Sequence, residues 1–393
     1  MKRFLVIFTD MRVLFGLGVV LTLVISALEL FRGGAENYWV FRDACLDFWQ
    51  DINVYTVEFV HAHDRYFIYS PIFCVLFTPF ALLPYYLGGF AWNLFGYVVF
   101  YFAVRNLPGK LADKTAPIFL FLLLSVAQSL FCFQFNLLVA AIFLWAYILF
   151  EKDKPFWAIL LIMVSATTKI YGAVELALLF CYPRFWRNMG YTLLAALMLI
   201  LLPALNGGFE GAVRVYNNWL WMLSIHQMNA PVYYSIIYLP VIRLFAIPYS
   251  RLFQAAILLV LGVLFVLNYR RWQTPDFRIG VLAGLMGYIV LFSDAAEYTT
   301  YTIALSGYAL WYFYSQPINS STNNNLQSSI SNLQFNKIIF WLLFLFFCVM
   351  PIDIFCPSFI CQFVHTHLWL GVLTFTVAWC TIIYTSIIKP LVF

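Results

Sequence analysis

The chain has 393 residues, of which 64% are hydrophobic and only 10% are charged. Soluble globular domains carry about 25% charged residues, so this composition excludes an ordinary soluble domain. The many long, charge-poor runs indicate membrane helices and not the alternating strands of a barrel. The net charge of +5 lies largely in short loops, where basic residues report topology and argue against a nucleic-acid partner. We therefore expect an all-α polytopic membrane protein.

The first apolar run, residues 13–30, follows a basic start and is not followed by a clear cleavage site. It predicts a signal anchor with its N-terminus in the cytoplasm, which places the first loop, residues 32–66, on the outer side. This loop holds six of the 17 acidic residues and two of the five histidines. Acid–base chemistry is therefore expected here first.

An amphipathic helix is predicted inside this outer loop. Apolar residues recur there at spacings of three and four: Phe41, Cys45, Phe48 and Ile52. Aspartates follow at four-residue spacing on the opposite face: Asp43, Asp47 and Asp51. Such a row suits a shared proton or a divalent cation, and it equally suits the solvated face of an interfacial helix.

Together with the first run, the remaining apolar runs predict about 12 helices with both ends of the chain in the cytoplasm. Residues 67–104 are expected to form two helices, and residues 116–150 two more, divided at 134–136. The other expected helices span residues 155–180, 191–205, 252–267, 279–292, 301–314, 338–350 and 368–387. Residues 206–231 form a second outer island, and residues 232–249 read as re-entrant or interfacial. In this topology the basic residues within 105–114 lie on the outer side of the membrane, which is against the positive-inside rule.

A polar segment near the C-terminus divides the chain. Residues 316–337 show no apolar periodicity and predict a disordered cytoplasmic linker. The expected organisation is a membrane catalytic domain over residues 1–315, this linker, and a C-terminal helix pair over 338–393.

Lys169 lies near the middle of an apolar run, where an ammonium group costs at least a few kcal/mol unless it faces a cavity or a partner. A phosphate or a carboxylate would satisfy it. An ion pair with Glu175 is the alternative, although a spacing of six separates the two residues around an α-helix. Asp294 and Glu297 at the outer end of a late helix face either a polar pocket or the membrane interface.

The sequence lacks the motifs of several other kinds of enzyme and metal site. The sequence has no phosphate-binding glycine loop, no zinc-ligand spacing and no GxSxG elbow, so cytosolic nucleotide chemistry is not expected. The eight cysteines are scattered, and most lie in apolar runs. Cys356 and Cys361 form either a bridge or two ordinary thiols.

An ordered set of motifs resembles glycosyltransferase family 87 of the GT-C superfamily. The motifs are ENYWVF, AC and INVY in the first loop, then YSPIF, PFALLP, QSLFCFQFN, ATTKIYG and PRFWR. They fall within residues 30–315. The resemblance implies a GT-C-like bundle in the cytoplasmic (inner) membrane with an outward active site. It further implies transfer of a hexose, mannose-like, from a polyprenyl-phosphate sugar to a lipid-linked or envelope glycan. No cofactor is expected, and the sequence leaves the need for a divalent metal open.

The resemblance also implies roles for individual residues. An inverting transfer needs a carboxylate base and a cationic group for the phosphate. The family places its base at the head of an Asp-x-x-Val-Tyr pattern, and that position here is Asn37, which cannot take a proton. We expect Glu36 or Asp43 to replace it, or else Glu297. The expected substrate contacts are Arg42, Arg65, Tyr69, Gln134, Asn136, Lys169 and Glu297. Gly172 stands where the family's lysine motif has proline.

Two other functions share these features. A flippase for lipid-linked oligosaccharides would use the same intramembrane charges without glycosyl transfer, but transporters often carry internal repeats, and none is evident here. A glycan polymerase or ligase would share the outer loop and transfer many sugars.

Overall fold

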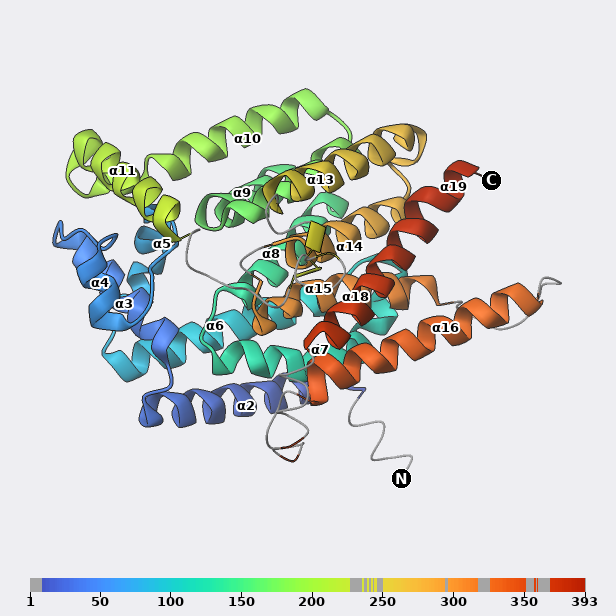
Figure 1. The fold of residues 1–393 in the computed structure, drawn as a ribbon, viewed down its shortest axis with the longest axis horizontal. Coiled ribbons are helices and arrows are strands. Elements are labelled where there is room, and N and C mark those ends of the chain that lie inside the picture. The colour runs from blue at the N-terminus through green and yellow to red at the C-terminus, as the bar shows by residue number, and fades with distance from the viewer. Residues whose placement is uncertain are drawn as a thin grey trace. The chain divides into compact units, whose positions relative to one another are not determined.

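The computed structural model is helical in every described element (Figure 1). It describes residues 9–226, 250–293, 296–316, 326–350 and 368–392, with isolated positions between 235 and 245 and at 357 and 359. Asp294, Cys356, Cys361 and most of the predicted re-entrant segment 232–249 lie outside the described residues. The chain forms two compact units, 1–106 with 126–231, and 107–125 with 232–393.

The first unit contains the predicted outer loop and the central helices. Its elements are α2 (Met11–Arg32), α3 (Glu36–Trp49), α4 (Val57–His63), α5 (Pro71–Ala81), α6 (Tyr85–Arg105), α8 (Asn136–Glu151), α9 (Pro155–Thr168), η2 (Ile170–Cys181), α10 (Phe185–Ile200), η3 (Leu202–Leu205) and α11 (Gly208–His226). Helix α7 (Thr115–Phe131) begins in the second unit and ends in the first.

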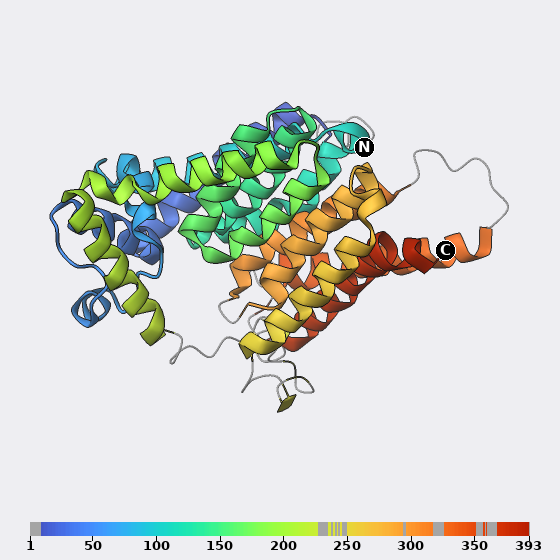
Figure 2. The same cartoon turned by 90° about the horizontal axis from the view of Figure 1, so that it is seen from above.

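The second unit contains the late helices, which Figure 2 shows in yellow to red. Its elements are η1 (Gly109–Lys114), α13 (Ser250–Leu267), η6 (Tyr269–Arg271), α14 (Pro275–Leu291), η7 (Tyr298–Thr300), α15 (Tyr301–Ser315), α16 (Leu326–Phe344), η8 (Leu345–Val349), α18 (Leu368–Ile383), η9 (Tyr384–Ile388) and α19 (Lys389–Val392). Helix α16 begins at Leu326, inside the predicted linker, and the division of the chain at 316–337 stays a prediction.

Six stretches of the described chain are long and apolar enough to cross a membrane. They are Met11–Arg32, Tyr85–Arg105, Gly109–Phe131, Phe185–Leu205, Ser250–Leu267 and Trp369–Leu391. The protein is therefore a multi-pass membrane protein, while the expected number of 12 membrane helices is not confirmed.

Helices α2 and α6 pack against each other in opposite directions. The Tyr97 hydroxyl, on α6, donates to the carbonyls of Leu14 and Phe15 near the start of α2, at 3.2 and 3.0 Å. At the other end, Gly89 lies so close to the Leu30 side chain that a Cβ would meet it at 2.7 Å. The end of α6 therefore lies beside the start of α2.

This pairing corrects the predicted topology between α2 and α6. Helix α5 has 11 residues, which span roughly 16 Å at about 1.5 Å per residue, whereas a hydrocarbon core is about 30 Å thick. Residues 67–104 therefore form the two predicted helices, of which only α6 is long enough to cross a membrane. Arg105 lies at the end of the unit where α2 begins, because it donates to the Tyr101 hydroxyl, which in turn donates to the Met11 carbonyl. In the second unit, Lys114 caps α15 by donating to the Phe313 carbonyl at 2.8 Å.

Surface labelling tests this topology. We expect Arg105→Cys and Gln50→Cys, at two exposed positions in a cysteine-free background, to react with an impermeant maleimide from opposite sides of the membrane, because only one crossing separates them. Two crossings over residues 67–104 would place both positions on one side, and labelling from the same side would contradict the α2–α6 arrangement.

The predicted helix 155–180 is instead a hairpin. Helix α9 ends at Thr168, and Lys169 takes an extended conformation with φ −132° and ψ 109°. The following η2 runs back along α9, so that a Cβ on Gly172 would lie 2.3 Å from the Ser165 hydroxyl. At its end, Tyr182 donates to the Glu151 carboxylate at 2.8 Å, beside the start of α9. Lys169 therefore lies at the tip of the hairpin.

Candidate active site

Helix α3 forms because its apolar residues repeat with the helical period, and its buried face confirms the predicted amphipathicity. The buried residues of this face are Tyr38, Val40, Phe41, Ala44, Cys45 and Phe48. The helix ends at Trp49, however, so Ile52 lies outside it and is half-exposed. The face packs against α5, where the Phe41 ring meets the Phe73 ring edge-on with centroids 4.9 Å apart.

The predicted row of three aspartates does not form. Asp51 follows the end of α3 with a positive φ of 60°, and it pairs with Arg214 of α11. Glu36 takes its place in the row, because at 3.6 residues per turn Glu36, Asp43 and Asp47 lie within about 40° of one another around α3. Within the described part of the chain, no group of three His, Cys, Asp or Glu side chains is arranged to hold a metal ion.

Charged side chains gather on this face, and we call them the α3 cluster. Its members are Glu36, Arg42, Asp43, Asp47, His63 and Arg65. Arg65 pairs with Glu36, and Arg42 lies 3.7 Å from Asp43. The structure thus brings together both carboxylates and both arginines that the sequence predicted as catalytic and phosphate-contacting residues.

His63 is a member of this cluster that sequence reasoning did not select. Its Nε2 lies 3.2 Å from the Asp43 carboxylate, and its Nδ1 lies 2.9 Å from the Phe59 carbonyl. Both partners are acceptors, whereas a neutral imidazole has only one N–H. A neutral His63 therefore donates to only one of these two acceptors at a time. The only sequence signal was the presence of two histidines in an acidic loop.

Asp47 lies beside this pair, half-buried. Loss of hydration on burial raises the pKa of Asp47 above its usual range, and the negative charge of Asp43 raises that pKa further. The nearby His63 acts in the opposite direction. The α3 cluster therefore contains two neighbouring carboxyls with different environments, which is a common arrangement where protons are transferred.

A second polar group, the lysine cluster, consists of Tyr69, Gln134, Asn136 and Lys169. The Lys169 ammonium donates to the Asn136 side-chain oxygen at 2.9 Å and lies 4.9 Å from the centre of the Tyr69 ring. The Asn136 amide donates in turn to the side-chain oxygen of Gln134. Four residues predicted as substrate contacts are thus in one place.

The position of the lysine cluster favours an anion. Asn136 is the first residue of α8, so the N-terminus of this helix and the positive end of its dipole lie beside Lys169. Helix N-termini with an adjacent cation are common phosphate sites in proteins.

Asn37 connects α3 to the break between α7 and α8. Its side-chain amide donates to the Cys132 carbonyl at 2.8 Å, and one turn further along α3 the Phe41 ring meets the Tyr69 ring edge-on at 5.0 Å. Asn37 therefore faces the lysine cluster, while Glu36 and Asp43 lie on another face of the same helix. The expected base position is occupied by a hydrogen-bond donor that holds a carbonyl.

This contact makes a prediction for the Asn37→Asp variant. A carboxylate cannot donate to the Cys132 carbonyl, so we expect the free energy of unfolding to fall by about 1–3 kcal/mol. Thermal unfolding in detergent, compared with the exposed Asn217→Asp variant as a control, measures the change. An Asn37→Asp protein of unchanged stability and higher transfer rate would show instead that a carboxylate at position 37 acts as the catalytic base.

Two further features concern the predicted acids. Glu297 belongs to the second unit, where its side chain accepts from the Thr300 backbone and caps η7. Its proposed contact with substrate stays a prediction. Glu175 lies on η2, fully buried, and neither of its carboxylate oxygens has a hydrogen-bond partner among the described residues. The predicted alternative of a helical Lys169–Glu175 pair does not apply, because the α-helix ends before Lys169.

The second predicted outer island packs beside the first. The Trp219 indole of α11 donates to the Ile68 carbonyl at 3.1 Å, immediately before Tyr69. Asn206 donates to the Phe48 carbonyl at the end of α3. The two polar islands, about 150 residues apart in the sequence, therefore lie at one end of the first unit.

The chain matches one family of known proteins. The family model for glycosyltransferase family 87 matches residues 67–293, which is more than half of the chain. That range contains the whole lysine cluster, and it excludes the residues of the α3 cluster. Neither the curated proteins nor the solved structures gave a match. The chain belongs to glycosyltransferase family 87.

Proposed function

We propose that this membrane glycosyltransferase moves one hexose, mannose-like, from a polyprenyl-phosphate sugar to a lipid-linked or cell-envelope glycan, with inversion at the anomeric carbon. The observation that carries the proposal is the lysine cluster. It combines Lys169 with the N-terminus of α8 in a predominantly apolar bundle, which suits the phosphate of a lipid-linked donor. The protein lies in the cytoplasmic membrane with this site facing outward.

The reaction assigns a role to each group. The oxygen of the acceptor hydroxyl attacks the anomeric carbon, and the bond from that carbon to the phosphate oxygen breaks. Lys169 stabilises the charge that develops on the departing polyprenyl phosphate. Glu36 or Asp43 takes the proton of the acceptor hydroxyl. Arg42 and Arg65 contact phosphate oxygens from the α3 side, and Gln134, Asn136 and Tyr69 hold the position of Lys169.

The test is a transfer assay with purified protein in lipid nanodiscs. Radiolabelled polyprenyl-phosphate mannose and the glucose analogue are offered with a lipid extract as acceptor source, and products are weighed by mass spectrometry. We expect a product heavier by one hexose and an equal rate in the presence of a chelator, because Lys169 supplies the positive charge at the phosphate.

Other outcomes would contradict the proposal. Products with many added sugars would indicate a polymerase or ligase. Movement of labelled lipid across vesicle membranes with no transfer would indicate a flippase. A donor that is neither consumed nor moved would reject the polyprenyl-phosphate sugar as substrate.

A further inference from the structure

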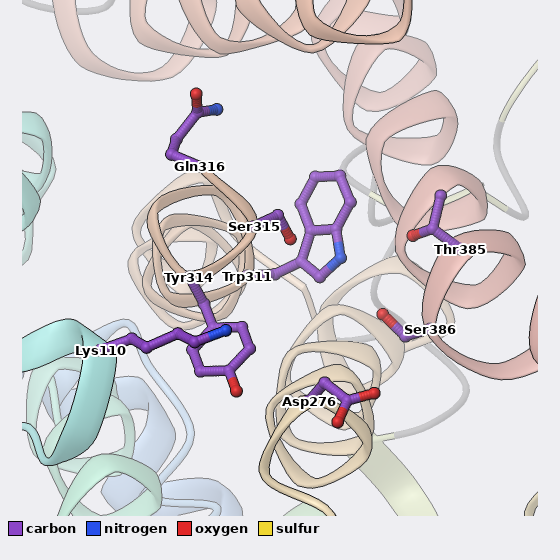
Figure 3. Close-up of a pocket in the computed structure, with 8 residues that line it drawn as sticks. All are labelled: Lys110, Asp276, Trp311, Tyr314, Ser315, Gln316, Thr385 and Ser386. Carbon is purple, nitrogen blue, oxygen red and sulfur yellow. The ribbon is translucent and has the colours of Figure 1, made fainter. Parts of the chain in front are cut away.

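A second polar site lies in the second unit, where residues of four elements meet. A pocket of about 400 Å³ opens there among side chains of η1, α14, α15 and η9 (Figure 3). Its lining residues are Lys110, Asp276, Trp311, Tyr314, Ser315, Gln316, Thr385 and Ser386. None of these belongs to the lysine cluster or to the α3 cluster.

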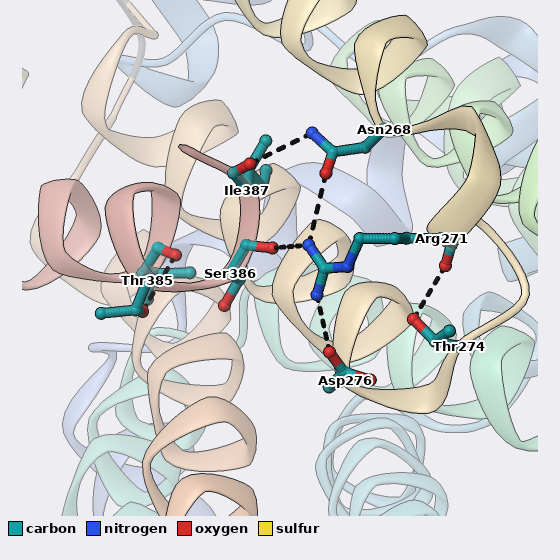
Figure 4. Close-up of polar contacts among 8 residues, drawn as sticks. Asn268, Arg271, Thr274, Asp276, Thr385, Ser386 and Ile387 are labelled. Carbon is teal, nitrogen blue, oxygen red and sulfur yellow. Dashed lines mark hydrogen bonds and ion pairs between the residues drawn. The ribbon is translucent and has the colours of Figure 1, made fainter. Parts of the chain in front are cut away.

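The negative charge in the lining is already paired. The Arg271 Nη2 donates to the Asp276 carboxylate at 2.7 Å, and its Nη1 donates to the Ser386 carbonyl at 2.9 Å (Figure 4). Asn268 supports the same guanidinium from its side-chain oxygen at 3.3 Å. These contacts hold Arg271 and Asp276 in place at the rim of the pocket. Lys110 is then the positively charged residue in the lining.

The remaining polar groups of the lining are mainly donors. The Lys110 ammonium lies over the Tyr314 ring at 4.9 Å and has no hydrogen-bond partner among the described residues. The same holds, within the described part of the chain, for the Trp311 indole N–H and the hydroxyls of Ser315 and Ser386. A cation with several N–H and O–H donors complements a ligand whose oxygens only accept, such as a phosphate diester.

The location selects a lipid as the source of that phosphate. Helix ends of a membrane bundle lie at the level of the lipid headgroups, where Trp and Tyr are also enriched. Cations outnumber acids in this region of the unit: Lys110, Lys114, Arg270 and Arg271 stand against Asp113 and Asp276. Basic pockets between helices at such an end bind anionic headgroups. We infer that this pocket binds the phosphate of an anionic phospholipid headgroup.

The experiment compares lipids retained by the full-length protein. Protein in nanodiscs that contain equal amounts of phosphatidylglycerol and phosphatidylcholine is released into the gas phase, and bound lipid is counted by native mass spectrometry. We expect selective retention of phosphatidylglycerol, with about fivefold less in Lys110→Gln. Trp311→Phe, which keeps an aromatic ring and removes the indole N–H, should also reduce retention. Lys389→Gln removes the same charge from an exposed position outside the lining and should bind like the wild type.

Three results would overturn the inference. Retention that is equal for both lipids would remove the headgroup preference, and equal loss in Lys389→Gln and Lys110→Gln would indicate general surface charge. Displacement of phosphatidylglycerol by millimolar glycerol phosphate would indicate a soluble phosphate ligand instead. Thermal unfolding of each variant shows that a loss of lipid does not come from a loss of fold.

Discussion

Replacing Lys169 with methionine should lower kcat for transfer by about 100- to 1,000-fold, the usual effect of removing one preorganised group that stabilises a developing oxyanion. The ammonium is held between Asn136 and Tyr69 at the first turn of α8, so no other described residue at that helix end supplies a positive charge at the same point. Consumption of radiolabelled donor in a single turnover measures the effect directly.

The control for this variant is Lys152→Met, which changes an exposed lysine at the far end of α8. Methionine at position 169 removes a charge from apolar surroundings, so the protein should unfold at an equal or higher temperature than the wild type. Full turnover by a well-folded Lys169→Met protein would exclude the proposed role of this residue.

The Gly172→Ala variant should both destabilise the protein and reduce transfer. A Cβ at this position would lie 2.7 Å from the Ser165 carbonyl carbon and 2.9 Å from the Ala166 nitrogen, which are backbone atoms of α9. The hairpin must open to admit it, at a cost of about 1–3 kcal/mol. Because Lys169 is at the tip, the same opening draws the ammonium away from Asn136.

Thermal unfolding and donor consumption measure the two effects together. Gly190→Ala is a matched control, since a Cβ there meets no atom within 4 Å and alanine favours its helix. A Gly172→Ala protein with the stability and rate of the wild type would mean that η2 does not pack closely on α9.

The sequence predicted helix α3 well, because the period of Phe41, Cys45 and Phe48 reflects a buried face directly. It predicted the end of that helix poorly. Asp51 continues the spacing of Asp43 and Asp47, yet the chain leaves the helix two residues earlier and Asp51 pairs with Arg214, which is distant in sequence. A spacing rule contains no information about such a tertiary partner.

The hairpin at Lys169 could not be predicted from hydropathy. A single long helix and two short antiparallel segments have the same apolar content, and no proline marks the reversal. Hydropathy also overestimated the length of α5. Its apolar run reaches the length of a membrane-spanning helix only when the extended residues before the helix are counted. The added crossing placed Arg105 at the opposite end of the unit from the start of α2, whereas the structure places both at the same end.

The candidate site was predicted in part because its charges are unusual in an apolar chain. Lys169, Gln134 and Asn136 each interrupt an apolar run, and the structure brings them into contact. His63 carried no comparable signal, since its role depends on the Phe59 carbonyl and the Asp43 carboxylate meeting the same ring. The departure at Asn37 was visible in the sequence, but its partner, a backbone carbonyl 95 residues away, was not.

The hairpin of α9 and η2 has a consequence for biosynthesis and for evolution. Because it starts and finishes at the same end of the unit, its lysine reaches the interior without being carried through the whole thickness of the bilayer during insertion. A segment of this kind also adds no net crossing. Relatives can therefore lengthen or shorten it while every later helix keeps its orientation.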